Sequence, residues 1–272
     1  MTTLPPVRFI NRDVDTARRA ATEAALARAG LPALRLPAIT PGTMPEHLAR
    51  RFAPGGEAVL GRGERACFAS HLAAAEAIAQ APPGWHGVAE DDVVFLAGAE
   101  EIAAVLAAAG ELSGFHALKM QRLPKSPTIL RARTGSHALV EYFHAPLRTE
   151  LYFLTPEGAR RLLDLAWEIA EPFDVFLRRV ARGDLRLLGV VPPLTKQARG
   201  VGSVVAAEGG RRQAGWRAKR RREVGAGIRR ELRFAAALGP ALYLRLAALH
   251  ARMNLGGPAP DDVGRYRIAP WP

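Results

Sequence analysis

An acidic cluster inside an otherwise apolar stretch constrains this chain more than any other feature. Residues 85–96 read WHGVAEDDVVFL, in which three consecutive acids, Glu90, Asp91 and Asp92, separate two apolar runs. Burying carboxylates without partners costs several kcal/mol, so such a cluster indicates a cation that faces it. A solvated acidic turn, or a helix start that collects acids, would explain the same residues equally well.

The cation interpretation predicts a definite chemistry for these acids. Side chains alternate along an extended segment, so Glu90 and Asp92 are expected on one side and Asp91 on the other. Carboxylate oxygens suit Mg²⁺ or Mn²⁺, and these ions keep open positions for phosphate oxygens. The cluster therefore favours a divalent cation that also binds a phosphorylated ligand.

The composition is that of a globular protein. The chain has 272 residues, of which 49% are hydrophobic and 24% charged, which suits one large domain with or without an appendage. The single cysteine, Cys67, excludes an internal disulfide framework and a cysteine-based zinc site. No apolar run approaches the roughly 18 residues that span a bilayer, and the first residues lack a signal-peptide pattern. We therefore expect a cytoplasmic protein, either free or bound peripherally to the cytoplasmic face of the inner membrane.

The net charge of +12 is distributed unevenly along the chain. Residues 206–272 contain 14 Lys and Arg against 5 Asp and Glu, whereas residues 1–205 contain 24 against 21. The difference predicts two parts. We expect a nearly neutral domain over residues 1–205 and a basic, mainly helical C-terminal extension over residues 206–272.

The extension allows three interpretations. Clustered arginines at 211–222 precede an apolar helical segment, Phe234–Met253, which is interrupted at Gly239–Pro240. This combination is typical of contact with an anionic membrane surface, here through residues 211–253. Nucleic acid is a rival polyanion, but the segment shows no recognised nucleic-acid motif, so no specific nucleic-acid binding is expected. A solvated tail whose apolar helix packs on the domain is the third interpretation.

The order of expected elements is typical of an α/β domain, because strands and helices are interleaved. Residues 31–63 are rich in proline and glycine and are predicted to form an irregular loop with few regular elements. Thr155 is expected to cap a helix that begins with Pro156. Further helices are expected at 16–29, 64–80, 99–109 and 173–180, and strands at 7–11, at the acidic cluster, and at 115–121, 128–133, 137–143, 150–154 and 185–191, the last of them.

Five segments of the chain follow one another in an informative order. They read FINRDVDTARR, ERACFASHLAAAEAIA, VAEDDVVFL, LYFLTPEGARRLL with PFDVFL, and PPLTKQARGVGS. Together they resemble glycosyltransferase family 25, which includes lipooligosaccharide galactosyltransferases of Gram-negative bacteria, over residues 7–203. The chain departs from the family pattern in three places, since Ala75 replaces a tryptophan, Arg12 replaces an apolar residue, and residues 114–123 lack the aspartate that many members have before their central strand.

The resemblance implies a GT-A-like, Rossmann-type nucleotide-sugar-binding domain. Such an enzyme moves a hexose, often galactose, from a UDP-sugar to a cell-envelope glycan or glycolipid such as lipopolysaccharide, and we expect inversion at the sugar. A divalent cation, Mn²⁺ or Mg²⁺, then lies on the donor diphosphate, with Asp92 as metal ligand, Glu90 as the second contributor and Asp91 beside them. A catalytically degenerate member that only binds a glycan or nucleotide is the alternative.

Donor contacts are implied at five positions. Asn11 ends the first strand, where it could bind uracil or ribose, and Arg18 follows in the next helix. Ser70 and His71 match the family's Ser-His pair, and Gln197 lies in the closing segment. Without the resemblance, Arg18 would be read as part of a solvated helix face and His71 as a packing residue.

An inverting transfer requires a base for the acceptor hydroxyl, usually a carboxylate. The resemblance makes Asp174 the first candidate, although an aspartate just after Pro172 would also stabilise a helix N-terminus. Glu141 is the second candidate, because it lies among apolar residues of a predicted strand. An outward position in an alternating strand would explain Glu141 as well.

Overall fold

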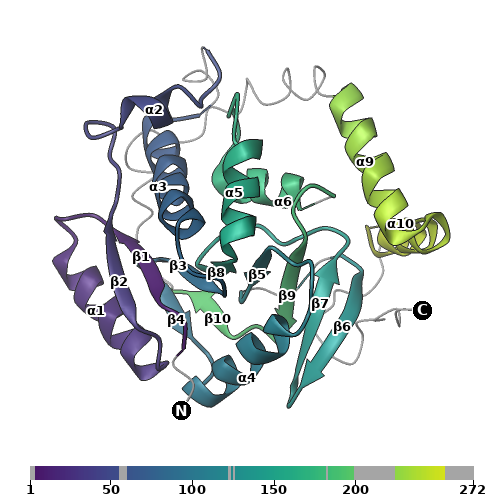
Figure 1. Ribbon diagram of the computed structural model, residues 1–272, viewed down its shortest axis with the longest axis horizontal. Helices are drawn as coiled ribbons and strands as arrows, with labels where there is room; N and C mark the ends of the chain where they lie inside the picture. The colour runs from purple at the N-terminus through teal and green to yellow at the C-terminus, as the bar shows by residue number, and fades with distance from the viewer. Residues whose placement is uncertain are drawn as a thin grey trace.

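The computed structural model describes residues 4–54, 60–121, 124, 126–181, 183–198 and 224–254. These residues form a mixed eight-stranded sheet in the order β2-β1-β3-β8-β5-β9-β7-β6, and a two-stranded sheet of β4 and β10 (Figure 1). The strands are β1 (Val7–Asn11), β2 (Ala33–Pro37), β3 (His86–Glu90), β4 (Val93–Phe95), β5 (Ala117–Lys119), β6 (Thr128–Thr134), β7 (His137–Tyr142), β8 (Leu151–Leu154), β9 (Leu187–Val191) and β10 (Thr195–Gln197). The helices are α1 (Thr16–Arg28), α2 (Glu46–Ala49), α3 (Arg62–Ala79), α4 (Ala99–Gly110), α5 (Pro156–Leu165), α6 (Phe173–Val180), α9 (Val224–Leu238) and α10 (Pro240–Asn254).

Strand direction brings several chain ends to one edge of the sheet. β1 pairs in parallel with β2 and β3, and β8 lies antiparallel between β3 and β5. The carboxyl ends of β1, β3 and β5 therefore lie at the same edge as the amino end of β8. Ligands of α/β sheets bind outside the carboxyl ends of strands, so this edge is where a site is expected.

The sheet is covered on both faces, which explains why β8 and β9 in its interior consist mainly of apolar residues. In β8, Tyr152 and Leu154 pack with α3, α5 and α6 on one face, whereas Leu151 and Phe153 pack with α1 and α4 on the other. All four side chains are completely buried. Such continuous burial is typical of a strand between two helical layers.

Most of the expected elements are confirmed. β1 and α6 have the predicted bounds, and the α3 and α4 helices differ from prediction by one or two residues at their ends. Thr155 caps α5 as expected, since its side chain accepts a hydrogen bond from the Gly158 N–H at 3.0 Å. The interleaved α/β class is also confirmed, in a mixed sheet.

Two expectations were wrong, and a third was incomplete. Residues 31–63 contain few regular elements, as expected, but one of these elements is β2, which pairs with β1 at the sheet edge, and α2 follows it. β2 is largely exposed, so its sequence does not alternate between apolar and polar residues. Its position depends on main-chain pairing with β1. β9 is not the last strand, since β10 follows and pairs with β4. The acidic stretch is not continuously extended either, because β3 ends at Glu90 and a turn separates it from β4.

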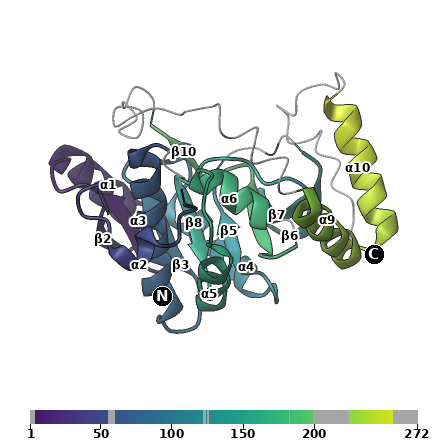
Figure 2. The same cartoon turned by 90° about the horizontal axis from the view of Figure 1, so that it is seen from above.

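The C-terminal helices lie beside β6 and β7, at the opposite end of the sheet from α1 and β2 (Figures 1 and 2). Phe234, Leu238 and Leu246 pack against Ile129 and Phe143. The helices are broken at the expected position and are bent by 115°. Among described residues no single helix is long and apolar enough to cross a membrane, and these two meet that requirement only as a bent pair. The arginine cluster at 211–222 and the expected domain boundary at 205/206 lie outside the described residues.

Candidate active site

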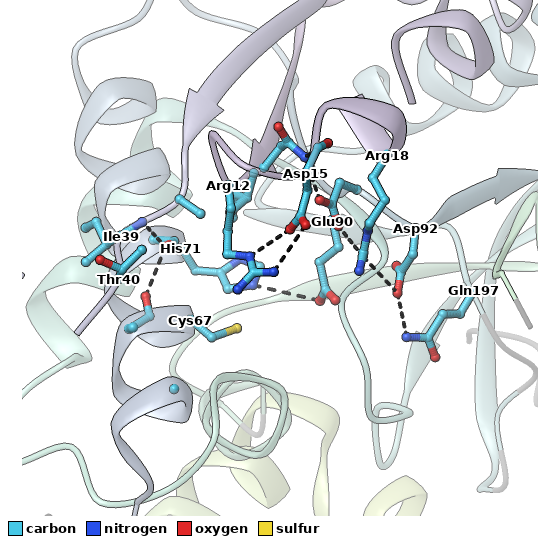
Figure 3. A pocket seen from close by; sticks show the side chains of 17 residues that line it. Arg12, Asp15, Arg18, Ile39, Thr40, Cys67, His71, Glu90, Asp92 and Gln197 are labelled. Carbon is cyan, nitrogen blue, oxygen red and sulfur yellow. Dashed lines mark hydrogen bonds and ion pairs between the residues drawn. The ribbon is translucent and has the colours of Figure 1, made fainter. Parts of the chain in front are cut away.

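A pocket lies at the edge of the sheet where β1 and β3 end (Figure 3). Eight of the ten residues singled out from the sequence line it, and only Asp174 and Glu141 do not. The pocket is lined by Ile10, Asn11, Arg12, Asp15, Arg18, Ala38, Ile39, Thr40, Gly63, Ala66, Cys67, Ser70, His71, Glu90, Asp91, Asp92 and Gln197.

The three acids reach this pocket by a route that differs from the prediction. β3 ends at Glu90, and the next two residues turn. The alternation of an extended strand therefore stops, and Asp91 lines the same pocket as Glu90 and Asp92 instead of pointing away. The turn gives each acid a different set of partners.

Asp91 is bound to the first strand and helix of the domain. Its carboxylate accepts a hydrogen bond from Asn11 Nδ2 at 2.7 Å and pairs with Arg18. Its backbone oxygen accepts a hydrogen bond from Thr22 Oγ1 at 3.0 Å. Asp91 therefore fixes the turn and the Arg18 side chain, and the Asn11 amide is used to hold an acid.

Asp92 is nearly buried and is only partly satisfied. Its side chain is 9% exposed, and Oδ2 accepts a hydrogen bond from Gln197 Nε2 at 2.8 Å. Arg18 lies 3.8 Å from the same oxygen. Oδ1 is buried without a hydrogen-bond partner in the described part of the chain. A buried anionic oxygen without a partner is costly, and a bound cation would satisfy it.

This donor set fits a cation that binds together with a ligand. Within the described ranges, no group of three or more His, Cys, Asp or Glu side chains could hold a metal ion by itself. Mg²⁺-type ions are commonly held by one or two carboxylates together with phosphate oxygens. The unsatisfied oxygen of Asp92 and the nearby Glu90 provide such a partial set.

Glu90 lies at the floor of the pocket. Its Oε1 accepts a hydrogen bond from Thr149 Oγ1 at 2.6 Å and lies 3.9 Å from His71 Nε2. Burial raises the pKa of Glu90 to about 7, neighbouring acids led by Asp92 add to the rise, and the Thr149 hydroxyl opposes it. The side chain is still 31% exposed, toward the pocket. Near neutral pH this carboxyl exchanges between its charged and neutral forms.

His71 forms part of the pocket wall in its neutral form. It is 1% exposed, shares a hydrogen bond of 3.0 Å with the Tyr152 hydroxyl through Nδ1, and stacks on Phe173 at 4.1 Å. Burial lowers the pKa of His71 to about 3. Its Nε2 has no hydrogen-bond partner within the described residues and lies on the Glu90 side.

Ser70 and Cys67 form the adjoining part of the wall on α3. The Ser70 hydroxyl donates to the Ala66 carbonyl and accepts from the Ile39 N–H, each at 2.9 Å. It therefore holds the segment after β2 against the pocket. Burial raises the pKa of the Cys67 thiol, which excludes a thiolate nucleophile at neutral pH.

Comparison with known proteins identifies the family of this chain. Residues 6–177 match glycosyltransferase family 25, described as LPS biosynthesis proteins, and these residues are more than half of the chain. The chain belongs to glycosyltransferase family 25. No curated protein matches it. The family assignment makes the protein a glycosyltransferase associated with lipopolysaccharide biosynthesis, which uses a sugar donor and a glycan acceptor. The matched range ends within α6, so β9, β10 and Gln197 lie beyond it.

In this glycosyltransferase, Asp174 lies beside the pocket without lining it. It is in the first turn of α6, directly after the Phe173 ring that stacks on His71. Its two carboxylate oxygens accept hydrogen bonds from the backbone N–H of Arg148 at 3.1 Å and of Val175 at 2.8 Å. These contacts suit an acid at a helix N-terminus, and they also fix the carboxylate next to the pocket.

Glu141 is not brought to the pocket. It is in β7, where it pairs with Leu188 near the start of β9, away from the edge at which β3 ends. Its Oε2 binds Arg131, whose Nε lies 2.8 Å away, and Arg186 at 3.3 Å. Two guanidinium groups therefore neutralise this nearly buried carboxylate.

Three further polar residues of this glycosyltransferase lie at the sheet edge where β3 ends, and the sequence alone did not single them out. Arg148, Thr149 and Glu150 precede β8, and the antiparallel direction of β8 puts them next to the end of β3. Glu150 is 1% exposed, and its Oε2 has no hydrogen-bond partner among described residues. Burial raises the pKa of Glu150. Three polar residues directly before an apolar strand indicate a candidate site in the sequence. That they lie at the pocket, however, follows only from the position of β8 beside β3 in the sheet.

Proposed function

We propose that this protein transfers a hexose, with galactose as the first candidate, from a UDP-sugar to a lipopolysaccharide-type glycan with inversion. The proposal rests on one observation above all, the buried Asp92 Oδ1 without a partner at the strand edge of a family 25 glycosyltransferase. A divalent cation, Mn²⁺ or Mg²⁺, that arrives with the donor diphosphate would satisfy that oxygen.

The residues around Asp92 suggest a division of roles. Asp92 holds the cation, with Glu90 as the second contributor, and Asp91 orients Arg18 toward the same space. When bound, the cation supplies charge neutralisation on the diphosphate. Arg18 lies between two carboxylates and can exchange one of them for a phosphate. His71 and Ser70 shape the pocket wall that faces the donor.

Asp174 is the proposed base. Its carboxylate is fixed beside the pocket by two backbone N–H groups and lies at the start of α6. A carboxylate in that position can take the proton of the acceptor hydroxyl as it attacks the sugar. Glu141 is unsuited to this role, since both of its arginine partners lie away from the pocket.

A thermal stability assay tests the donor site. The protein would be heated with UDP, UDP-galactose or UDP-glucose, with and without Mn²⁺, as wild type and as Asp92→Ala. Ligand at 100 times its Kd adds about 2.7 kcal/mol to the free energy of unfolding. A Mn²⁺-dependent stabilisation that the variant lacks supports the proposal, and its absence from wild type contradicts it. Donor binding without any sugar transfer would instead favour the degenerate, binding-only alternative.

The C-terminal helices support a second part of the proposal, contact with the anionic cytoplasmic membrane surface through residues 211–253. α9 and α10 expose the large apolar side chains Ile228, Leu232 and Leu244, which are 55%, 65% and 66% exposed. An exposed arginine directly follows two of them, Arg229 after Ile228 and Arg245 after Leu244. Apolar and cationic side chains on one helix are the combination that binds an anionic membrane surface.

Vesicle sedimentation tests this contact. Binding to vesicles with anionic lipid, and little binding to neutral vesicles, is expected for wild type. Leu232→Glu should weaken it, whereas Val14→Glu, a change at another exposed apolar residue near α1, should not. Equal binding by both variants, or a preference for nucleic acid over vesicles in competition, would contradict a membrane role.

A further inference from the structure

Arg148 has a backbone conformation that an arginine rarely adopts. Its φ is +73°, and Glu168 is the only other non-glycine residue with positive φ in the described part of the chain. Left-handed backbone is unfavourable for residues with a Cβ, and glycine is the usual residue there. Such conformations persist when their surroundings impose them, and they concentrate at functional sites.

Buried side chains impose this conformation on Arg148. Its carbonyl accepts hydrogen bonds from Lys119 Nζ and from Gln121 Nε2, the latter at 3.0 Å. Lys119 also donates to the Pro146 carbonyl at 2.7 Å. Lys119 is 1% exposed and Gln121 is completely buried. The Arg148 N–H donates to Asp174 Oδ2 at 3.1 Å, so both sides of the residue are held.

This arrangement aims the Arg148 guanidinium at the acidic edge. It donates to Gln197 Oε1, and Gln197 Nε2 in turn donates to Asp92 Oδ2. Glu150 Oε1 lies 3.7 Å from the guanidinium. The Arg148 side chain is 46% exposed. A guanidinium has five N–H donors, so it can take a ligand oxygen besides these contacts.

We propose that Arg148 binds the β-phosphate of the donor diphosphate and stabilises it as the leaving group. The inference rests on the proposed function. In the transfer, the acceptor oxygen forms a bond to the sugar anomeric carbon and gives its proton to Asp174. The bond from that carbon to the β-phosphate oxygen breaks, and its electron pair remains on the oxygen. Arg148 and Asp92 both hydrogen-bond to Gln197. The guanidinium is therefore close enough to the proposed cation ligand to stabilise the charge that develops on the leaving oxygen.

The unfavourable backbone makes glycine an informative replacement. Arg148→Gly removes the guanidinium and relieves the left-handed conformation, so the variant should melt at the wild-type temperature or above. Glu168→Gly is a matched control, since it relieves the other positive φ, at the segment between α5 and α6. Arg148→Lys keeps a positive charge without the planar fork.

Titration calorimetry with UDP and with UMP, in the presence of Mn²⁺, is the test. Wild type and Glu168→Gly should prefer UDP, and Arg148→Gly should lose about tenfold or more of that preference while binding UMP as wild type does. Arg148→Lys should be intermediate. Arg148→Gly with an intact UDP preference, or with equal losses for UDP and UMP, overturns the role of Arg148. If wild type binds neither nucleotide, the proposed function itself fails.

Discussion

Two groups of buried carboxylates in this molecule differ in how completely they are satisfied. Glu141 in β7 lies between Arg131 and Arg186, and two guanidinium groups bind the same oxygen. At the end of β3, Asp92 keeps a buried oxygen without a hydrogen-bond partner among the described residues. Burial there raises the pKa of Glu90 to about 7.

The difference separates a structural ion pair from a binding site. A buried charge whose partners come from the protein needs nothing further, and removing one partner is destabilising. A buried charge that the protein leaves incomplete is costly until a ligand completes it. We therefore expect substitutions at Glu141 to affect stability and substitutions at the pocket acids to affect binding and turnover.

The largest expected effect is on turnover. Asp174→Asn keeps the shape of the side chain but removes the proposed base, so kcat should fall by about 10³-fold. UDP binding should stay within a few-fold of wild type, because Asp174 is proposed to act on the acceptor hydroxyl and not on the donor diphosphate. Steady-state kinetics and titration calorimetry on the same preparation measure both quantities. An unchanged kcat would mean that Asp174 only stabilises the N-terminus of α6 and is not the base.

Glu141→Gln should show the opposite behaviour. It leaves the buried Arg131 side chain, which is 9% exposed, without its anion and should lower the free energy of unfolding by about 3 kcal/mol. The kcat of the folded fraction should be that of wild type. Urea unfolding combined with an activity measurement below the transition checks the prediction. Lost turnover at full stability would place Glu141, and not the pocket acids, in the chemistry.

The next effect concerns the pH dependence of stability without metal. The pKa of Glu90 is raised from 4.5 to about 7 in the folded protein, so the folded state holds a proton that the unfolded state has released. Stability from this group is present below pH 4.5 and is lost as the pH rises to about 7. Relative to wild type, Glu90→Gln should gain about 3 kcal/mol between these limits.

Urea unfolding of wild type and Glu90→Gln from pH 4.5 to 8, in the presence of a chelator, measures this difference. A constant difference between Glu90→Gln and wild type would mean that Glu90 titrates at an ordinary pKa.

The smallest expected effect is a further change in the pKa of Glu90. The Thr149 hydroxyl donates to the charged form of Glu90 and holds its pKa down. Thr149→Val removes this hydrogen bond at nearly constant volume, so the Glu90 pKa should rise by about one unit. Carboxyl carbon chemical shifts followed over pH would measure it. A fall in the pKa would show that the hydroxyl does not stabilise the carboxylate.

The sequence predicted well which residues line the pocket, because these residues lie on or at the ends of predictable elements. Asn11 ends β1 and Glu90 ends β3, and parallel strands bring their carboxyl ends to one edge. Ser70 and His71 are on a long helix whose bounds were nearly correct. Local pattern and strand direction were sufficient for these positions.

The sequence could not distinguish Glu141 from the pocket acids, since both are acids in apolar strands. The two kinds of acid differ in the partners that the fold brings to them, and these partners can be distant in sequence. Arg186, for example, is 45 residues from Glu141. Arg148 was missed for a related reason. Its importance depends on the antiparallel placement of β8 and on a positive φ imposed by Lys119, neither of which has a local pattern. The pairing of β2 with β1 was missed because an exposed edge strand lacks alternation.

The most direct measurement is Mn²⁺-dependent UDP binding by calorimetry, with Asp92→Asn and Glu141→Gln compared at a temperature where both are folded. The account predicts that Asp92→Asn loses the Mn²⁺-dependent part of binding at wild-type stability or above. It predicts that Glu141→Gln binds as wild type does and is less stable. Mn²⁺-dependent binding that survives in Asp92→Asn would contradict the claim that this incompletely satisfied carboxylate is the cation site.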